Sequence, residues 1–345
     1  MWEKVEGFKN LLFLEGYGFS SNIYALKHSS IALIDVGNDY TAFFEFKEEV
    51  GEISEIDQIF LTHSHNDHTL GLLELFRAYK DFDNVEIYVH ELMRDAIEKR
   101  AKTFGKKVRV VGVRGGENIN FGGEEALILK TPGHTIDSLS LYLKEKHALF
   151  SGDAVVVNPV IDESLGGRLV DYIISLRHLR KMEISAIFPG HGYYALKGAR
   201  EILDKAYLKA LSFLEPDKPL KEVAKKALSL GMVEEAEYAL EKQLEVEFDE
   251  EALFGLASIK ADKGEFEAVK ELLNGYDTFE SHHIVGVAAM KAGKFDEAVN
   301  HFKKALEIRE DKNIRLLLAT ALYEAGKVEE AMKIEELKSI LSKIK

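Results

Sequence analysis

Four side chains that can bind a metal lie within six residues of the chain. They are His63, His65, Asp67 and His68, and they directly follow the apolar run Ile59–Leu61. A short apolar run of this kind predicts a buried strand, so its end would deliver the polar side chains to one small volume. Imidazole nitrogens and carboxylate oxygens are donors that zinc and iron accept. The spacing therefore predicts a metal site, because a chance histidine-rich turn seldom carries this pattern.

Three later fragments carry further candidate ligands. Each follows an apolar, strand-like run and ends at a histidine or an aspartate: Thr131–His134, Ser151–Asp153 and Pro189–His191. A glycine directly before each candidate ligand lets the backbone bend sharply and approach a crowded centre. We therefore expect strand ends to bring His134, Asp153 and His191 to the site of the first four residues.

These motifs resemble those of the metallo-β-lactamase-fold hydrolases, over about the first 200 residues. An earlier element, Ile34–Gly37, is similar to the family's Asp-x-Gly strand end, in which the aspartate supports the site without binding metal. The resemblance implies an α/β fold, the αββα sandwich, for a hydrolase domain over residues 1–214.

The resemblance also implies a dinuclear metal centre with seven ligands. The first metal would be held by His63, His65 and His134. The second would be held by Asp67, His68 and His191, with Asp153 as the bridge between the two ions. Asp67 and Asp153 are then the expected catalytic residues. The centre keeps a net positive charge, which favours an anionic substrate and a metal-bridging hydroxide as the nucleophile. Zinc is the expected metal, with iron or manganese as alternatives.

The identity of the ligands distinguishes branches of the family. Histidine at position 65 and aspartate at position 153 match the pattern of the glyoxalase II-type thioesterases, the lactonases and several phosphodiesterases. The expected substrate is thus a small molecule with a thioester, lactone or ester bond. Glutathione is disfavoured because the thioesterases' Lys-x-Tyr element is missing, although Tyr193 matches their glutathione-contacting tyrosine. An acyl-homoserine lactone is disfavoured because Val156 replaces the lactonases' tyrosine.

The segment 155–168 lies between two candidate ligands and should line the substrate pocket. Its polar members Asn158 and Arg168, with Tyr193 and Tyr194 after the last ligand, are the candidate substrate contacts.

The chain after residue 214 has a different organisation. Four glycine-led motifs begin at Gly231, Gly264, Gly293 and Gly326, at spacings of 33, 29 and 33 residues. This period resembles that of tetratricopeptide repeats. The resemblance implies an all-α superhelix over residues 215–345, with a terminal capping helix at 335–345 and one shortened turn around Asn274 and Gly275.

The repeat motif also predicts how the helices pack. Each glycine would form the turn between two antiparallel helices. Seven positions before a glycine stands a small residue, Ala257, Gly286 or Ala319, which would allow close helix packing. Larger residues would fill the remaining core: Phe254, Phe302, Leu306 and Tyr323.

Composition restricts the compartment and the partners. The net charge of −14 disfavours general nucleic-acid binding, and there is no cysteine for disulfides or thiolate metal sites. No apolar run approaches the ~20 residues that span a bilayer, and the start lacks a signal-peptide pattern. We expect a cytoplasmic protein. The 30% of charged residues and the scarcity of glutamine indicate a thermophilic source.

Two classes of function follow. The first is a metallohydrolase whose repeats bind a protein or peptide partner, mediate self-association or cover the pocket. The alternatives are a phosphodiesterase of the same fold, and a repeat-based interaction protein whose metal domain is mainly structural. A complete ligand set favours the enzyme, because structural metal sites are normally closed.

Overall fold

The chain forms two compact units, Met1–Phe213 and Leu214–Lys345. The computed structural model describes residues 1–38, 43, 45–80 and 82–335. No helix among these residues is long and apolar enough to cross a membrane. That residues 1–214 and 215–345 are domains able to fold separately stays a prediction.

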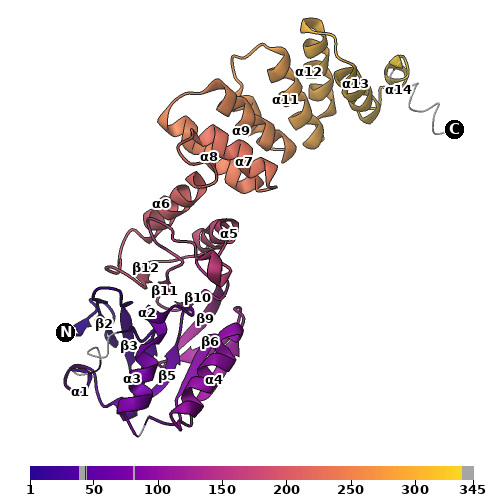
Figure 1. Cartoon of the computed structure of the whole chain (residues 1–345). Helices are drawn as coiled ribbons and strands as arrows, with labels where there is room; N and C mark the ends of the chain where they lie inside the picture. The colour runs from indigo at the N-terminus through magenta and orange to yellow at the C-terminus, as the bar shows by residue number, and fades with distance from the viewer. Residues whose placement is uncertain (39–42, 44, 81, 336–345) are drawn as a thin grey trace, which may run out of the picture. The chain divides into compact units, whose positions relative to one another are not determined.

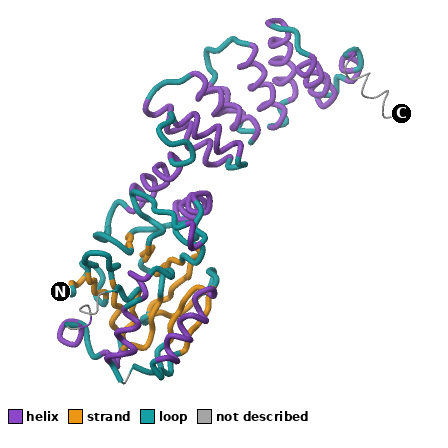
Figure 2. Tube along the Cα trace, in the orientation of Figure 1, coloured by secondary structure: helices purple, strands orange, loops and turns teal. Residues whose placement is uncertain are grey.

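Unit 1 contains two β-sheets (Figures 1 and 2). The first sheet has the order β1 (Glu3–Lys4), β2 (Leu11–Leu14), β3 (Ile23–Lys27), β4 (Ile31–Ile34), β5 (Ile56–Phe60), β6 (Glu86–His90) and β7 (Arg109–Val113). The second has the order β12 (Ala186–Pro189), β11 (Ala148–Gly152), β10 (Leu139–Leu143), β9 (Glu124–Lys130) and β8 (Asn118–Phe121). Neighbours are antiparallel except along β4-β5-β6-β7 and between β11 and β12, which are parallel.

Alternating residues of strands in the first sheet pack into two different hydrophobic cores. In β4, Ala32 and Ile34 face the core between the two sheets, whereas Ile31 and Leu33 face the core on the other side. This period of two follows from the pleat of a strand. The core between the sheets is rich in aromatic rings, of which Phe150 and Phe188 stack with centroids 4.7 Å apart. Both faces of strand β4 are therefore buried, as its continuous apolar run predicts.

Helices cover the outer faces of the sheets. The helices of the first sheet and its connections are α1 (Phe46–Glu49), α2 (Asn66–Thr69), α3 (Gly71–Ala78) and α4 (Arg94–Thr103), with the 3₁₀ turns η2 (Ile53–Glu55) and η3 (Glu91–Met93). The turn η4 (Glu163–Leu165) and the helices α5 (Leu169–Arg180) and α6 (Ala199–Ser212) belong to the second half, beside β10–β12 in Figure 1. Two mixed layers of strands between helices confirm the predicted αββα sandwich.

Strand direction brings the candidate ligands to one edge of the sandwich. Asp35 and the hexapeptide follow β4 and β5, which are parallel neighbours, so both segments leave the first sheet at the same edge. Asp153 and His191 follow β11 and β12, the parallel pair of the second sheet. Parallel strands end side by side, and the carboxyl ends of both pairs meet at the metal-binding motifs.

Unit 2 consists of consecutive helix pairs. They are α7 (Leu220–Ser229) with α8 (Val233–Val246), α9 (Glu250–Asp262) with α10 (Phe266–Leu272), α11 (Phe279–Lys291) with α12 (Phe295–Ile308), and α13 (Lys312–Glu324) with α14 (Val328–Ala331). The four motif glycines lie in the turns within these pairs and have φ between 72° and 76°. This left-handed conformation favours glycine, which confirms the turns predicted from the repeat. Residues 336–345 of the expected capping helix lie outside the described residues.

Two details of the repeat differ from the predictions. The repeat that spans 29 residues instead of 33 is shorter in its second helix, α10, and not only in a turn. Helix α10 has seven residues, whereas α8 and α12 have 14. The turn at Gly275 follows this short helix. The prediction that Tyr323 fills the core is wrong, because its side chain is 56% exposed. Phe302 is fully buried, and Phe254 and Leu306 pack against the same core.

We expect residues 1–214 to retain the chemistry of the intact chain, because all seven candidate ligands lie within unit 1. The fragment should bind metal and cleave a small ester with a kcat within about tenfold of the full chain, equivalent to about 1.4 kcal/mol. Metal analysis and an esterase assay on both proteins provide the test. A folded, metal-loaded fragment without turnover would place essential residues in the repeats.

Gly286 and Gly255 form a matched pair for testing the close packing of unit 2. A Cβ at Gly286 would lie 2.5 Å from Cε1 of the buried Phe302, whereas at Gly255 the nearest atom would be 3.4 Å away. Gly286→Ala should therefore destabilise unit 2 by about 1–3 kcal/mol, while Gly255→Ala should stabilise it by about 0.5–1 kcal/mol because alanine favours a helix. Urea unfolding of the two variants measures both. Equal effects would contradict the role assigned to Gly286.

Candidate metal centre

Three histidines converge on one point at the end of β5. The Nδ1 atom of His65 lies 3.0 Å from Nε2 of His63 and 2.9 Å from Nε2 of His134. His63 and His134 are buried. These are the three residues expected to hold the first metal, and we refer to them as the first subsite.

The outward nitrogens of these histidines are all occupied by hydrogen bonds. His65 Nε2 donates to Oδ2 of Asp162 at 2.9 Å, and His134 Nδ1 donates to the carbonyl of Val160 at 2.7 Å. His63 Nδ1 lies 3.1 Å from Oγ1 of Thr62. The Thr62 hydroxyl gives its only proton to the carboxylate of Asp35, 2.8 Å away, and so it accepts from His63.

Because their other nitrogens are bonded outward, the three imidazoles turn His63 Nε2, His65 Nδ1 and His134 Nε2 toward one another. Burial, followed by the neighbouring imidazoles, holds the pKa of His63 well below its usual value. Burial likewise lowers the pKa of His134. Neutral rings such as these two offer lone pairs as metal ligands, and a cation between the facing nitrogens would be held by them. The donor set of the first subsite therefore fits a metal ion.

The second subsite consists of Asp67, His68 and His191. Oδ2 of Asp67 lies 3.0 Å from His191 Nε2 and 3.5 Å from His68 Nε2. Asp153 lies between the two subsites: its Oδ2 is 3.5 Å from His134 Nε2 and 3.6 Å from His191 Nε2. Its Oδ1 is 3.6 Å from His68 Nε2. The structure thus brings all seven candidate ligands together, and His63 also clusters with His68 and Asp153. Their division between two metals stays a prediction.

Two polar atoms of this cluster are buried without a hydrogen-bond partner in the described part of the chain. They are Nε2 of His68 and Oδ1 of Asp153. Leaving such atoms unsatisfied is costly, and both belong to residues that the sequence predicts as metal ligands. A metal ion would satisfy both, so the residues of the second subsite also fit this group.

Negative charge surrounds His68. Although burial opposes its protonation, the carboxylates of Asp35, Asp153 and Asp67 raise the pKa of His68 to about 9. The same charges that retain a proton attract a metal cation. Asp67 itself is partly buried, which opposes ionisation, but its hydrogen bond from His191 keeps the pKa of the carboxyl below the usual value.

The backbone is strained or closely packed where the ligands need space. Asp35 has a left-handed φ of 53°, which is uncommon for a residue other than glycine. A Cβ at Gly190 would lie 2.4 Å from Oδ1 of Asp153 and 2.7 Å from Cε1 of His68. Only glycine at position 190 leaves room for these two side chains.

Asp162 is a functional candidate that the sequence did not reveal. Besides binding His65, its carboxylate accepts hydrogen bonds from the backbone of Ser164 and Leu165, and its backbone N–H donates to the carbonyl of His134. One residue thereby connects two ligands of the first subsite. Asp162 lies 97 positions from His65 in the sequence, and no motif surrounds it. Its location in the segment 155–168, which we expected to line the pocket, was the only sequence feature that pointed to it.

The four predicted substrate contacts lie in different surroundings. Arg168 is exposed and pairs with Asp171 at 3.7 Å, and Asn158 is exposed. Tyr194 packs edge-on against Phe13, with ring centroids 5.1 Å apart, at the core between the sheets. Tyr193 is exposed near the same ring. Substrate binding by these residues stays a prediction.

Family comparison identifies the fold that carries this site. The model of the metallo-beta-lactamase superfamily matches residues 16–191. The chain belongs to the metallo-beta-lactamase superfamily. The predicted family is thus confirmed; members of this superfamily bind divalent metals, and this chain has a cluster of histidines and aspartates that could hold such ions. A tetratricopeptide-repeat model matches residues 289–335, which confirms the predicted repeat class of unit 2.

Several relatives are similar to part of this chain. A Beta-lactamase-like protein 2 homolog of Caenorhabditis elegans is 31% identical over 163 residues, 47% of this chain and 48% of the relative. A hydroxyacylglutathione hydrolase of Bartonella tribocorum is 33% identical over 142 residues, 39% and 48% of the two chains. An atrochrysone carboxyl ACP thioesterase of Aspergillus fumigatus is 29% identical over 142 residues, 41% and 30%. The chain thus spans half or less of the length of these relatives.

Asp162→Asn should weaken metal binding at the first subsite about 10–100-fold, because the amide holds the His65 ring less firmly and supplies no charge. Chelator competition with zinc measures this affinity without any substrate. The neighbouring variant Glu163→Gln removes a charge from an exposed residue of the same turn and should leave the affinity unchanged. Equal affinity in the Asp162→Asn and wild-type proteins would show that Asp162 does not position His65.

Proposed function

We propose that the chain is a dinuclear metal-dependent hydrolase that cleaves an ester-type bond, namely a thioester, lactone or ester, of a small anionic substrate. One observation carries this proposal: seven side chains converge in two subsites joined by Asp153, with His68 Nε2 and Asp153 Oδ1 buried and free of hydrogen bonds among the described residues. Zinc is the proposed metal, because imidazole and carboxylate suit it. When bound, such ions lower the pKa of water and stabilise developing negative charge.

The residues of the chain provide the rest of the mechanism. Asp35 and Thr62 fix the rings of His63 and His68, and Asp162 fixes that of His65. This rigid support keeps reacting groups in place at no cost during the reaction. The second subsite is accessible, since the side chains of His191 and Asp67 are 39% and 25% exposed, so a substrate can reach it.

The choice of an ester-type bond rests on the relatives. Two of them carry the names hydroxyacylglutathione hydrolase and carboxyl ACP thioesterase, and both names denote thioester chemistry. A substrate panel with thioesters, lactones, simple esters and phosphodiesters, assayed with the zinc, iron and manganese forms, tests this choice. Turnover confined to phosphodiesters would favour the alternative activity.

For unit 2 we propose protein binding. Tetratricopeptide repeats stack into a superhelix whose surface commonly binds a peptide or a protein, or a second copy of the same chain. The match to a repeat model supports this role. Light scattering of the purified chain would separate self-association from binding of another protein.

Removing the charge of Asp153 tests the proposed centre. The wild-type protein should hold close to two metal ions per chain. Asp153→Asn should lose the second ion and lower turnover by orders of magnitude, because an amide is a poor bridge between two cations. Elemental analysis and an esterase assay measure both effects, and Asp57→Asn, at an exposed position of β5, is the matched control. A fully active Asp153→Asn protein with two metals would eliminate the bridge.

A further inference from the structure

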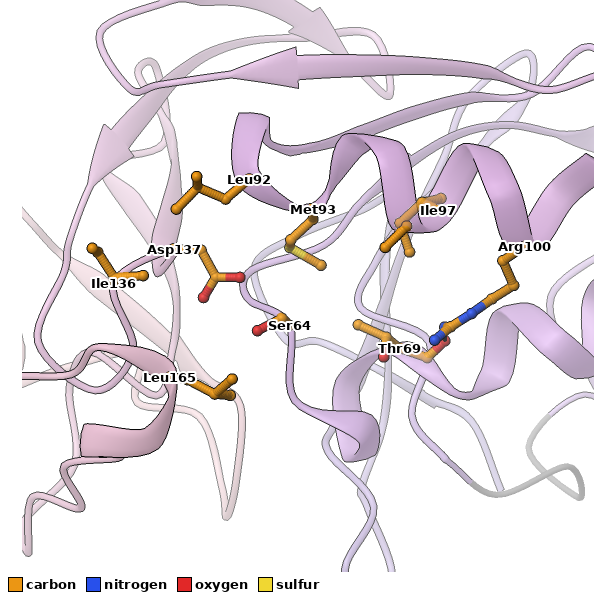
Figure 3. A pocket seen from close by; sticks show the side chains of 10 residues that line it. Ser64, Thr69, Leu92, Met93, Ile97, Arg100, Ile136, Asp137 and Leu165 are labelled. Carbon is orange, nitrogen blue, oxygen red and sulfur yellow. Dashed lines mark hydrogen bonds between the residues drawn. The ribbon is translucent and has the colours of Figure 1, made fainter.

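A pocket of about 380 Å³ lies next to the metal centre (Figure 3). Its apolar walls come from η3, α4, the turn after His134 and η4, and include Met93, Ile97, Ile136 and Leu165. Ser64, which separates the ligands His63 and His65, also lines it. The pocket therefore adjoins the segment that carries two residues of the first subsite.

Two charged residues of the pocket have no ion-pair partner in the described chain. Asp137 is only 4% exposed; its Oδ1 accepts from the Thr135 hydroxyl at 2.6 Å, and no hydrogen bond within the described residues reaches its Oδ2. Burial lowers the pKa of the nearby His90, an effect that the carboxylate of Asp137 opposes. The carboxylate of Asp137, which lines the pocket, is therefore the acidic group that a ligand meets there.

Arg100 is the second of these charges. It is partly buried, and its one hydrogen bond with a described residue is a long contact of 3.4 Å from Nη1 to the carbonyl of Thr69. A guanidinium has five N–H donors, so most of them are available to a ligand. Figure 3 shows Arg100 and Asp137 on different sides of the pocket, with Met93 and Ile97 between them.

This arrangement selects a ligand by chemistry. The apolar walls favour a hydrocarbon chain, and Arg100 favours an anion, with a carboxylate fitting its planar fork. Asp137 repels an anion from the opposite side and so fixes the direction of the ligand. We propose that the pocket binds the part of the substrate remote from the cleaved bond, and that this part is an apolar chain ending in a carboxylate held by Arg100.

This inference rests on the proposed hydrolase function and names the substrate class of that site. The test uses the metal-loaded, full-length protein and p-nitrophenyl esters of hexanoic acid and of hexanedioic acid with its second carboxyl free. The two esters differ only in the terminal carboxylate. The wild-type protein should prefer the hexanedioate ester about tenfold or more in kcat/KM. Arg100→Gln should abolish this preference, and Arg100→Lys should restore a large part of it.

Arg94→Gln is the matched control, because Arg94 lies on the same helix, pairs with Glu98 at 3.0 Å and is not part of the pocket lining. It should keep the wild-type preference. Calorimetric titration with hexanedioate, hexanoate and acetate gives a second readout that is independent of turnover. All three can coordinate metal, so only the extra affinity of hexanedioate reports on Arg100.

The outcomes separate the two proposals. If the esters are cleaved but neither the preference nor hexanedioate binding depends on Arg100, the pocket assignment is overturned and the hydrolase function stands. If no ester is cleaved while Arg100-dependent binding of hexanedioate persists, the hydrolase function fails and the pocket remains a carboxylate site. If Arg94→Gln also lost the preference for the hexanedioate ester, the assignment would be overturned. The preference would then depend on the overall charge of the protein and not on Arg100.

Discussion

The metal centre depends on one buried carboxylate that binds no metal in our proposal. Asp35, 2% exposed, accepts hydrogen bonds from the backbone and the hydroxyl of Thr62, both at 2.8 Å, and from His68 Nδ1 at 2.7 Å. Thr62 in turn orients His63. One residue thus fixes a ligand of each subsite, and its left-handed backbone is the strain that this position requires.

The two sheets contribute to the centre in a complementary way. The first sheet supplies the hexapeptide and Asp35 from parallel strand ends, and the second supplies His134, Asp153 and His191. The segment 160–168 then ties the second sheet's His134 to the first sheet's His65 through Val160 and Asp162. The first subsite is therefore built from residues of both sheets, and the aromatic core between the sheets holds these two halves of the sandwich together.

Most of the fold and of the ligand cluster could be predicted from the sequence because both are expressed in local patterns. The hexapeptide is contiguous, each later ligand follows a glycine at a strand end, and the repeat glycines recur at a visible period. The features that escaped prediction depend on tertiary contacts. Asp162 and Arg100 are ordinary polar residues until loop packing brings them to the centre or the pocket. Tyr323 was assigned to the core by residue type, but the helix face that it occupies is exposed.

The unequal support of the two subsites has a consequence for metal exchange. Each histidine of the first subsite has an outward hydrogen bond, whereas His191 is 39% exposed and forms no hydrogen bond through Nδ1 among the described residues. If both subsites hold ions as proposed, the second ion leaves and returns faster than the first. At limiting metal supply the protein would then persist as a one-metal form, and the fraction of complete centres would follow the concentration of free metal in its surroundings.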